Sequence, residues 1–342
     1  MKKYSVAVIG VGVVGIELIR CLKRRSFPLR SFRVFARSER DIVVDSTKYR
    51  VEAIDKAKFD GIDIALFAGT EGEKGASLTY AQQFIGKGAV VIDNGADFRL
   101  KPDVPLIVPE ANRASISSHK GIIANPNCTT IQAVVALAGI YKNFGLEKII
   151  LTSFQATSGA GRGAVETLWE EVRDIVNNNS DKEYSSIDKK LDRDFKTFGN
   201  QIAFNVIPQI GSFQEDGYTS EEWKVVHETH KILSDDRIKI SATCVRVPVF
   251  TSHSEAIYFQ TKKDAQLAEI ANILKSSQGV RFVDFPSYSL PLDVDGQDLV
   301  YVSRLRPDLS DQNSFWLWVV ADNLLKGAAL NAVQIAEELI KL

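Results

Sequence analysis

Residues 5–22 read SVAVIGVGVVGIELIRCL, and this stretch decides the fold. The apolar run 5–10 predicts a buried strand, and the spacing of apolar residues over 16–22 predicts a helix. The turn between them has the pattern GxGxxG, in which glycine permits a tight bend and lets a pyrophosphate approach the start of the helix. A strand, a glycine turn and a helix in this order predict a dinucleotide-binding domain. The residues expected to contact the dinucleotide here are Gly10, Gly12, Val13, Val14 and Gly15.

Apolar strands and helices continue to alternate downstream. Strands are expected at 32–36, 63–68, 89–93 and 121–124, with a helix at 77–86. This alternation predicts a parallel sheet with helices on both faces. Ligands bind at the carboxyl ends of the strands in such sheets. Three residues at predicted strand ends are therefore candidate cofactor contacts: Gly69, Thr70 and Asn94.

The end of the second strand indicates which dinucleotide is bound. An NAD enzyme usually carries an acidic residue here that holds the ribose 2′-hydroxyl, whereas this chain carries Arg37, Ser38 and Arg40. Arginine and serine suit a 2′-phosphate, so we expect NADP. Glu39 leaves open the alternative, a solvated loop of mixed charge.

After about residue 147 the pattern changes, and strands become more frequent toward the C-terminus. The expected elements are strands at 148–155, 239–249, 255–261, 299–305 and 315–320 and a helix at 324–342. We therefore predict an α/β protein with an N-terminal Rossmann-type parallel sheet and a second α+β domain that contains a mixed sheet. Residues 1–128 plus 323–342 would form the dinucleotide-binding domain, and residues 129–322 the second domain.

Cys128 follows the turn 125–127, which joins a predicted strand to a predicted helix. At the start of a helix, free N–H groups and the helix dipole favour a thiolate over a thiol. A thiolate at this junction is a good nucleophile for a carbonyl or an acyl phosphate. The alternative is a small hydrophobic residue that only packs at the helix start.

Arg246 lies within an apolar predicted strand. Alternation places Val245 and Val247 on one face and Cys244 and Arg246 on the other. A buried arginine is costly unless it lines a polar cleft or is paired, and a substrate carboxylate would supply a bidentate partner. A structural ion pair is the alternative.

His253 is the histidine best placed to act as a base, whereas the other three histidines lie in polar segments and are expected at the surface: His119, His227 and His230.

A predicted helix begins after Thr219, which forms a capping box with Glu222. Glu221 and Lys224 lie three residues apart on one face of this helix. Taken alone, they are typical of a solvated charge pair.

Arg99 is a loop arginine to which the residues around it assign no role.

The composition excludes several classes of protein. Of the 342 residues, 45% are hydrophobic and 25% are charged, and the formal net charge is −1. This balance gives no basis for a nucleic-acid or membrane-surface partner, and no apolar stretch is long enough to span a bilayer. Three cysteines without metal-ligand spacing predict a reducing, cytoplasmic location and no metal site.

Several segments in the right order resemble aspartate-β-semialdehyde dehydrogenases, and the resemblance covers nearly the whole chain. The most specific segments are NPNCTTIQ at 125–132, AFNVIPQI at 203–210, TCVRVPV through HSE at 243–255 and DNLLKGAA at 322–329. The resemblance implies that Cys128 is the nucleophile and His253 the general acid and base. It also implies that Gln155 positions the acyl group.

The resemblance assigns the substrate and cofactor contacts as well. It implies that Arg246 holds the substrate α-carboxylate and Glu221 its ammonium, and that Arg99 and Lys224 bind the phosphate group. The residues that it places near the nicotinamide end of the cofactor are Ser158, Gly159 and Asn323.

The implied reaction is the reductive dephosphorylation of L-aspartyl-4-phosphate to L-aspartate-4-semialdehyde, a step in lysine, methionine and threonine biosynthesis. The cysteine attacks the acyl phosphate, inorganic phosphate leaves, and NADPH supplies hydride to the thioester. Such a mechanism needs no metal. The family also implies a homodimer formed through the second domain, which would be the catalytic and dimerisation domain.

Two features depart from the family pattern, and both lie at the cofactor site. The glycine turn is one residue shorter than the usual GxxGxxG, and the loop 69–75 carries two acids where many members carry serines. The stretch 93–99 also resembles the N-acetyl-γ-glutamyl-phosphate reductases, which are the second hypothesis because their cysteine motif differs. The third hypothesis is a non-catalytic dinucleotide-binding homologue, which only the altered glycine turn supports.

Overall fold

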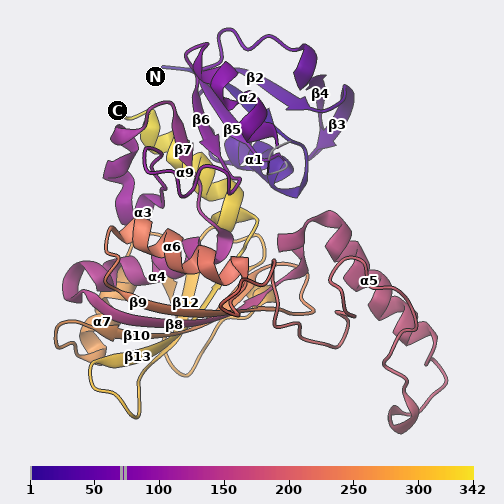
Figure 1. Cartoon of the computed structure of the whole chain (residues 1–342), viewed down its shortest axis with the longest axis vertical. Coiled ribbons are helices and arrows are strands. Elements are labelled where there is room, and N and C mark those ends of the chain that lie inside the picture. Colours follow the sequence, from indigo (N-terminus) through magenta and orange to yellow (C-terminus); the bar gives the residue numbers. More distant parts are fainter. Residues whose placement is uncertain (1, 70–71, 73–74) are drawn as a thin grey trace.

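The computed structural model describes residues 2–69, 72 and 75–342. Within these residues the strands form two sheets, one in each half of the molecule (Figure 1). The first sheet has seven described strands in the order β3-β4-β2-β1-β5-β6-β7, and only β3 and β4 pair antiparallel. The strands are β1 (Tyr4–Ile9), β2 (Leu29–Ala36), β3 (Arg40–Val44), β4 (Thr47–Ala53), β5 (Ile64–Phe67), β6 (Val90–Asp93) and β7 (Ile122–Ala124).

The second sheet has six described strands in the order β11-β12-β13-β10-β8-β9. They are β8 (Leu146–Gln155), β9 (Lys239–Arg246), β10 (His253–Thr261), β11 (Val280–Phe282), β12 (Val300–Pro307) and β13 (Ser314–Ala321). This sheet is mixed, because β8 pairs in parallel with β9 and antiparallel with β10. A mostly parallel first sheet and a mixed second sheet confirm the predicted fold class.

Helices cover both sheets and fill the space between them (Figure 1). The α-helices are α1 (Val13–Arg24), α2 (Ala76–Ile85), α3 (Pro109–Asn112), α4 (Cys128–Phe144), α5 (Arg162–Asn177), α6 (Ser220–Leu233), α7 (Leu267–Ser276), α8 (Pro291–Val294) and α9 (Leu330–Leu339). Short 3₁₀ helices occur at Ile54–Lys56, Arg113–Ser118, Thr157–Ala160 and Tyr184–Ser186, and a π-helical turn occurs at Leu325–Ala329.

The central strand β1 contributes to a different core on each of its faces. Val6 and Val8 pack into a cluster with residues of α1 and α9, whereas Ala7 and Ile9 pack into a second cluster with Phe84 of α2. This alternation places helices on both faces of the parallel sheet, as the sequence predicts.

Helix α4 connects the two halves of the molecule. Its residues Ile131 and Val134 belong to one continuous core that includes Phe67 of the first sheet and Leu151 of the second. Because α4 is apolar on nearly all sides, it is buried along most of its length. The first residue of α4 is Cys128, which therefore lies where the two halves meet.

Helix α5 and the chain that follows it project from the second sheet as an arm (Figure 1). The arm has a small core of its own, in which Leu168 and Ile175 of α5 pack against Ile202, Ala203 and Ile207. The polar loop of the arm, residues 178–201, is mostly exposed.

Three details differ from the sequence-based expectations. The hairpin of β3 and β4 is not among the predicted strands, because ion pairs such as Lys48–Asp41 (2.7 Å) put charges where alternating apolar residues are expected. Strand β9 ends at Arg246 instead of 249, since Pro248 supplies no N–H for a ladder. The C-terminal helix begins as a π-helical turn. The proposed domain boundaries stay a prediction.

Candidate active site

The turn before Cys128 is held by a helix cap. Asn127 is the N-cap of α4, and its Oδ1 accepts hydrogen bonds from the N–H groups of Thr129 (3.0 Å) and Thr130 (3.4 Å). Cys128 is therefore the first residue of the helix, as predicted. Because the cap occupies these two N–H groups, the N–H of Cys128 itself is the donor of this turn for which the described residues provide no acceptor.

Two carboxylates on one face of α6 support this cap. Glu221 accepts a hydrogen bond from Nδ2 of Asn127 at 2.8 Å, and Glu228 accepts one from the backbone N of Asn127 at 2.6 Å. The predicted capping box of Thr219 and Glu222 begins α6 and sets its register. Glu221 is buried, so the interpretation of a solvated charge pair is wrong for it, although its other oxygen lies 3.2 Å from Nζ of Lys224.

The resting state of Cys128 differs from the expectation. The residue is partly exposed, yet burial of its thiol and the nearby carboxylate of Glu221 raise its pKa to about 11. The neighbouring guanidiniums of Arg99 and Arg246 oppose this rise without cancelling it. The helix start favours the thiolate, as predicted, but desolvation opposes it and has the larger effect. The thiol needs a base or a bound ligand to ionise near neutral pH.

Arg246 lies on the buried face of β9 with Cys244, as strand alternation predicts. Its Nη1 donates to the carbonyl of Ala156 at 2.6 Å, and its guanidinium stands 6.0 Å from the ring of Phe198. No carboxylate of the described residues lies within 4.0 Å of it. Burial lowers the pKa of Arg246, as expected for a cation without a counter-ion. Among the described residues, Arg246 therefore has no carboxylate with which it could form the structural ion pair that was the alternative.

His253 is fully buried at the start of β10. Its Nδ1 accepts a hydrogen bond from the N–H of Ala156 at 3.0 Å, so the neutral ring carries its proton on Nε2. Burial, reinforced by Arg246, lowers the pKa of His253 well below its ordinary value. Nε2 has no partner among the described residues. A Cβ on Gly159 would lie 3.3 Å from this nitrogen and 3.2 Å from Nη1 of Arg246, so Gly159 lies directly against both side chains.

Gln155 joins the catalytic candidates to the carboxylate of α6. Its Nε2 donates to Oγ of Ser153 at 3.1 Å and lies 3.5 Å from Oε1 of Glu221. Gln155 and Arg246 are register partners on neighbouring strands β8 and β9. The structure therefore brings Gln155, Glu221 and Arg246 together beside the Cys128 turn.

The segment that begins at Asn323 closes another side of the site. Oδ1 of Asn323 accepts hydrogen bonds from Oγ of Ser158 at 3.1 Å and from the N–H of Ser252 at 2.9 Å. A Cβ on Gly327 would lie 2.9 Å from Cβ of Cys128, so only glycine fits there without displacement. Sequence reasoning missed Gly327, and its only signal is a glycine inside a predicted helix.

Arg99 is buried behind the Cys128 turn. Its Nε donates to the carbonyl of Asn125 (3.0 Å), and its Nη2 to the carbonyl of Asn94 (2.7 Å). Its Nη1 forms an ion pair with Glu228 at 3.1 Å. These bonds orient the guanidinium rigidly. The loop that carries Arg99 is itself held by α6, because Nζ of Lys231 donates to the carbonyls of Arg99 (2.7 Å) and residue 101 (2.6 Å).

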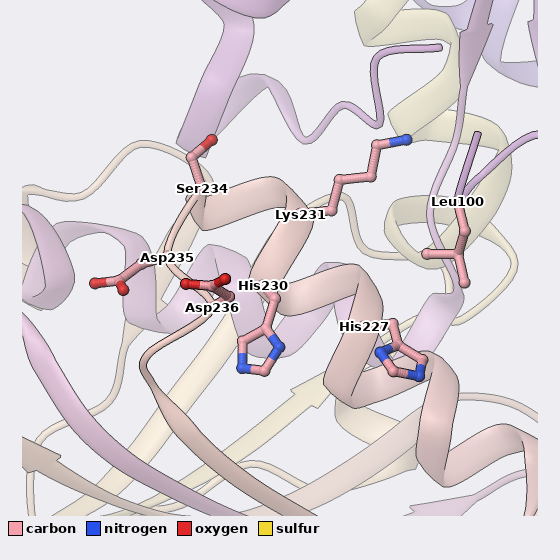
Figure 2. Close-up of a pocket in the computed structure, with 7 residues that line it drawn as sticks. All are labelled: Leu100, His227, His230, Lys231, Ser234, Asp235 and Asp236. Atoms are coloured by element: carbon pink, nitrogen blue, oxygen red, sulfur yellow. The ribbon is translucent and has the colours of Figure 1, made fainter. Parts of the chain in front are cut away.

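Figure 2 shows a pocket lined by residues of α6 and of the loop that follows it. The side chain of Lys231 extends in a different direction from the imidazoles of His227 and His230. His227 is exposed and stacks on Trp223 at 4.7 Å, while Nε2 of His230 lies 2.8 Å from the carbonyl of Ile238. These histidines take no part in the site described above.

A cleft of about 1000 Å³ opens at the carboxyl ends of β1, β2 and β5. Six of the fourteen predicted cofactor contacts line this cleft: Gly10, Gly12, Arg37, Ser38, Arg40 and Gly69. Thr70 lies outside the described residues. The side chain of Asn94 is bonded to the carbonyl of Phe67 (2.7 Å) and to Nδ2 of Asn125 (3.0 Å), so a role for it in cofactor binding stays a prediction.

The three glycines of the turn have the separate roles that a dinucleotide site requires. Gly10 has a φ of 102°, and a side chain there would collide with the carbonyl of Ala68. A side chain on Gly15 would collide with the carbonyl of Gly10, whereas a Cβ on Gly12 would meet nothing within 4 Å. Gly12 therefore leaves space for a pyrophosphate at the start of α1, and the shortened turn still fits a dinucleotide. Contacts by Val13 and Val14 stay predictions.

Glu39 does not compete for the ribose in this structure. Its carboxylate pairs with Arg50 at 2.6 Å, and Glu39 does not line the cleft, whereas Arg37, Ser38 and Arg40 do. The end of β2 therefore presents positive charge and hydroxyl groups to the ribose, which fits NADP.

Comparison with known proteins agrees with this geometry. Residues 5–119 match the family model described as "Semialdehyde dehydrogenase, NAD binding domain", and residues 137–326 match "Semialdehyde dehydrogenase, dimerisation domain". The aspartate-semialdehyde dehydrogenase of Aquifex aeolicus is 44% identical over 99% of this chain and 98% of its own length. That of Bacillus subtilis is 42% identical over 98% of this chain and 97% of its own.

The chain belongs to the aspartate-semialdehyde dehydrogenase family.

A solved relative agrees over the whole fold. The crystal structure of aspartate semialdehyde dehydrogenase II complexed with ASA from Vibrio cholerae superposes with a TM-score of 0.92 at 38% identity, covering 100% of this chain and 99% of its own. The predicted resemblance to aspartate-semialdehyde dehydrogenases is thus confirmed. The comparisons support neither the N-acetyl-γ-glutamyl-phosphate reductases nor a non-catalytic homologue.

A buried acid beneath the site leads to a prediction about stability. Glu255 of β10 is fully buried, and burial raises its pKa well above the ordinary value, although the neighbouring amide of Gln132 opposes this rise. Above pH ~4.3 the unfolded chain releases this proton while the folded chain keeps it, so stability falls by about 1.4 kcal/mol per pH unit until the folded pKa is reached. Glu255→Gln has no proton to lose.

We therefore expect the advantage of Glu255→Gln over the wild type to grow as the pH rises. Urea unfolding of both proteins at several pH values between 5 and 8 measures this difference. A constant difference across the range would show that Glu255 is not protonated in the folded protein.

Proposed function

We propose that this chain catalyses the reductive dephosphorylation of L-aspartyl-4-phosphate to L-aspartate-4-semialdehyde. The observation that supports it most strongly is the pairing of opposite charges beside Cys128. Arg246 is a buried cation without a carboxylate partner in the described residues, and Glu221 is a buried anion close by. An α-amino acid carries the complementary pair, a carboxylate and an ammonium. A substrate bound between them would present its side-chain acyl group to the thiol.

His253 supplies the proton transfers in this proposal. Its low pKa keeps the ring neutral, and Nδ1 accepts a hydrogen bond from the N–H of Ala156, so Nε2 carries the ring proton at rest and can donate this proton to the substrate oxygen and take it back. Since the thiol of Cys128 is protonated at rest, it must lose its proton as it attacks the acyl carbon. The resulting bond is a thioester, and phosphate leaves with the electron pair of the broken C–O bond and takes up the proton that the thiol loses.

The backbone and Gln155 assist the acyl carbon. The N–H of Cys128 is the donor of the first turn of α4 that the Asn127 cap does not occupy, and it can stabilise the developing oxyanion. Gln155, fixed by Ser153, orients the acyl group. NADPH, when bound in the cleft at Gly12, supplies the hydride that reduces the thioester.

Arg99 and Lys224 would contact the phosphate group, although each already has a protein partner. Arg99 pairs with Glu228 and Lys224 with Glu221. Both cations are therefore positioned before the substrate arrives. Their pairing also keeps the positive charge beside Cys128 moderate when no phosphate is bound.

The outer face of the second sheet supports the proposal of a homodimer. This face carries Phe154 and Trp318, whose rings lie 5.7 Å apart, and Ile150, four residues before Phe154 on β8, is 42% exposed. Apolar residues of this size on an uncovered sheet face are typical of an interface. The family model matched by residues 137–326 is described as a dimerisation domain.

The proposed location is the cytoplasm, because all three cysteines, including the catalytic Cys128, are free thiols and suit a reducing compartment. Among the described residues, no helix combines the length and the apolar character needed to cross a membrane.

A comparison of two substrates tests the proposal. We expect the wild type to reduce NADP⁺ with aspartate semialdehyde and phosphate, but not with N-acetylglutamate semialdehyde, which has no ammonium. Glu221→Gln should lower kcat/KM for aspartate semialdehyde by about 10- to 100-fold, because a hydrogen bond to a charged group is worth about 1.5–3 kcal/mol. Glu166→Gln, at an exposed acid on α5, is the matched control. A preference for the acetylated substrate, or full activity of Glu221→Gln, would contradict the proposal.

A further inference from the structure

Lys326 is a fully buried cation that the proposed reaction does not use. It lies in the π-helical turn Leu325–Ala329. Its three N–H donors are shared among four acceptors within hydrogen-bond distance of Nζ: both carboxylate oxygens of Glu110 (2.8 and 2.7 Å), Oδ1 of Asn331 (2.8 Å) and Oε1 of Gln334 (2.7 Å). A buried ion pair adds little to stability compared with apolar residues of the same size. The cluster is therefore better explained by the position in which it holds the π-helical turn.

The π-helical turn contains backbone hydrogen bonds that each span five residues. The N–H of Gly327 bonds to the carbonyl of Asp322 (3.1 Å), and that of Ala329 to the carbonyl of Leu324 (3.0 Å), which widens the helix by one residue. The widened turn brings the backbone of Gly327 against Cys128. Lys326 thus directly precedes the residue that packs on the thiol side chain.

The same turn also leads to the cofactor side of the site. Asn323, three residues before Lys326, binds Ser158 and the backbone of Ser252. A displacement of the turn would therefore move Gly327 and Asn323 together. In the proposed reaction, these two residues flank the thiol and the nicotinamide.

A second path joins the cluster to Cys128. Asn331, which accepts a bond from Lys326, donates through Nδ2 to Oδ1 of Asn125 at 2.7 Å and to the carbonyl of Ile107 at 3.0 Å. Asn125 is part of the turn that carries Cys128. Glu110 lies on α3, which packs against both α4 and α9. The cluster therefore supports the Cys128 turn from two directions.

We propose that Lys326, through its ion pair with Glu110, is a positioning residue that holds Cys128 and Asn323 at the separation required for reduction of the thioester. This inference rests on the proposed function. It predicts that loss of the ion pair slows the reaction more than it weakens the binding of either ligand, because a displacement of about 1 Å can cost about 100-fold in rate.

Two variants and one control test this proposal. Glu110→Gln removes the charge of the acid and keeps its size, and the double variant Lys326→Met/Glu110→Gln removes both charges, so that neither leaves a buried carboxylate unpaired. Arg25→Met is the control, because Arg25 also anchors α9, through a bidentate bond to Glu337 (2.7 Å), and is not hydrogen-bonded to Lys326 or to the π-helical turn.

We expect kcat to fall about tenfold in Glu110→Gln and about 30- to 100-fold in the double variant, with KM for aspartate semialdehyde and Kd for NADPH changing less than about threefold. The rate at which iodoacetamide alkylates Cys128 without cofactor should change at least threefold in the double variant. Arg25→Met should lower the melting temperature and leave both rates unchanged.

The other outcomes are distinct. If the double variant folds with wild-type kcat and alkylation rate, or if Glu110→Gln alone folds and matches the wild type in both, Lys326 only fills the core and the inference is wrong. If Arg25→Met lowers kcat as much as the double variant, general loosening of α9 explains the effect. Lack of turnover in the wild type would instead refute the proposed function.

Discussion

Cys128→Ser is expected to lower kcat by about 10⁵-fold, because no other described residue of the site can form the acyl intermediate. Serine has nearly the size of cysteine, but its hydroxyl ionises far less readily. The thiol of Cys128 already depends on its surroundings to ionise, since its pKa is raised to about 11. A hydroxyl at this position would be still harder to activate. Steady-state NADPH formation from aspartate semialdehyde measures the loss.

Binding and folding provide the controls for this variant. The melting temperature and the Kd for NADPH should match those of the wild type, because Cys128 lies outside the dinucleotide cleft. Cys21→Ala removes a thiol that is buried in α1 and should keep full kcat. If Cys128→Ser retained more than about 1% of the wild-type kcat, covalent catalysis by this residue would be contradicted.

Arg246→Leu is expected to lower kcat/KM by about 10³-fold while leaving the folded protein as stable as before, or more stable. The loss of activity follows from removal of the only proposed partner of the substrate carboxylate, and such truncations cost about 2–5 kcal/mol. The stability result follows from the buried guanidinium, which has no carboxylate within 4.0 Å among the described residues. Removing a buried cation that lacks a counter-ion relieves a desolvation penalty.

Together, the two measurements separate a substrate-binding arginine from a structural one. A structural arginine would lower the melting temperature in proportion to the activity. The variant should also raise the pKa of His253, because Arg246 helps to lower it. A titration of the histidine signals by NMR measures this shift. Loss of stability together with activity would contradict the assigned role of Arg246.

Local patterns in the sequence predict the two sheets and the position of Cys128 well. The glycine turn at Gly10, the capping box at Thr219 and the strand alternation around Arg246 each depend on residues close together in the chain, so their physical causes can be read directly. The structure confirms these features because no distant contact overrides them.

Contacts between distant segments could not be predicted in the same way. The pKa of Cys128 depends on the depth of its burial and on Glu221, which is far away in the sequence. The close approach of Gly327 to Cys128 and the ion pair between Lys326 and Glu110 join segments about two hundred residues apart. In one sequence, a buried lysine within a helix is indistinguishable from a surface lysine, so its partners appear only in the folded protein.

We propose that the thioester on Cys128 forms and breaks by exchange with phosphate, so that phosphate cleaves it when the reaction starts from aspartate semialdehyde. The most direct test is the rate of NADP⁺ reduction by the wild type with aspartate semialdehyde as the concentration of inorganic phosphate is raised. We predict a rate that rises with phosphate and saturates, and that is lower with NAD⁺ because Arg37, Ser38 and Arg40 line the part of the cleft where the 2′-phosphate of NADP⁺ would lie. A rate that does not depend on phosphate, or no turnover with either dinucleotide, would contradict the account.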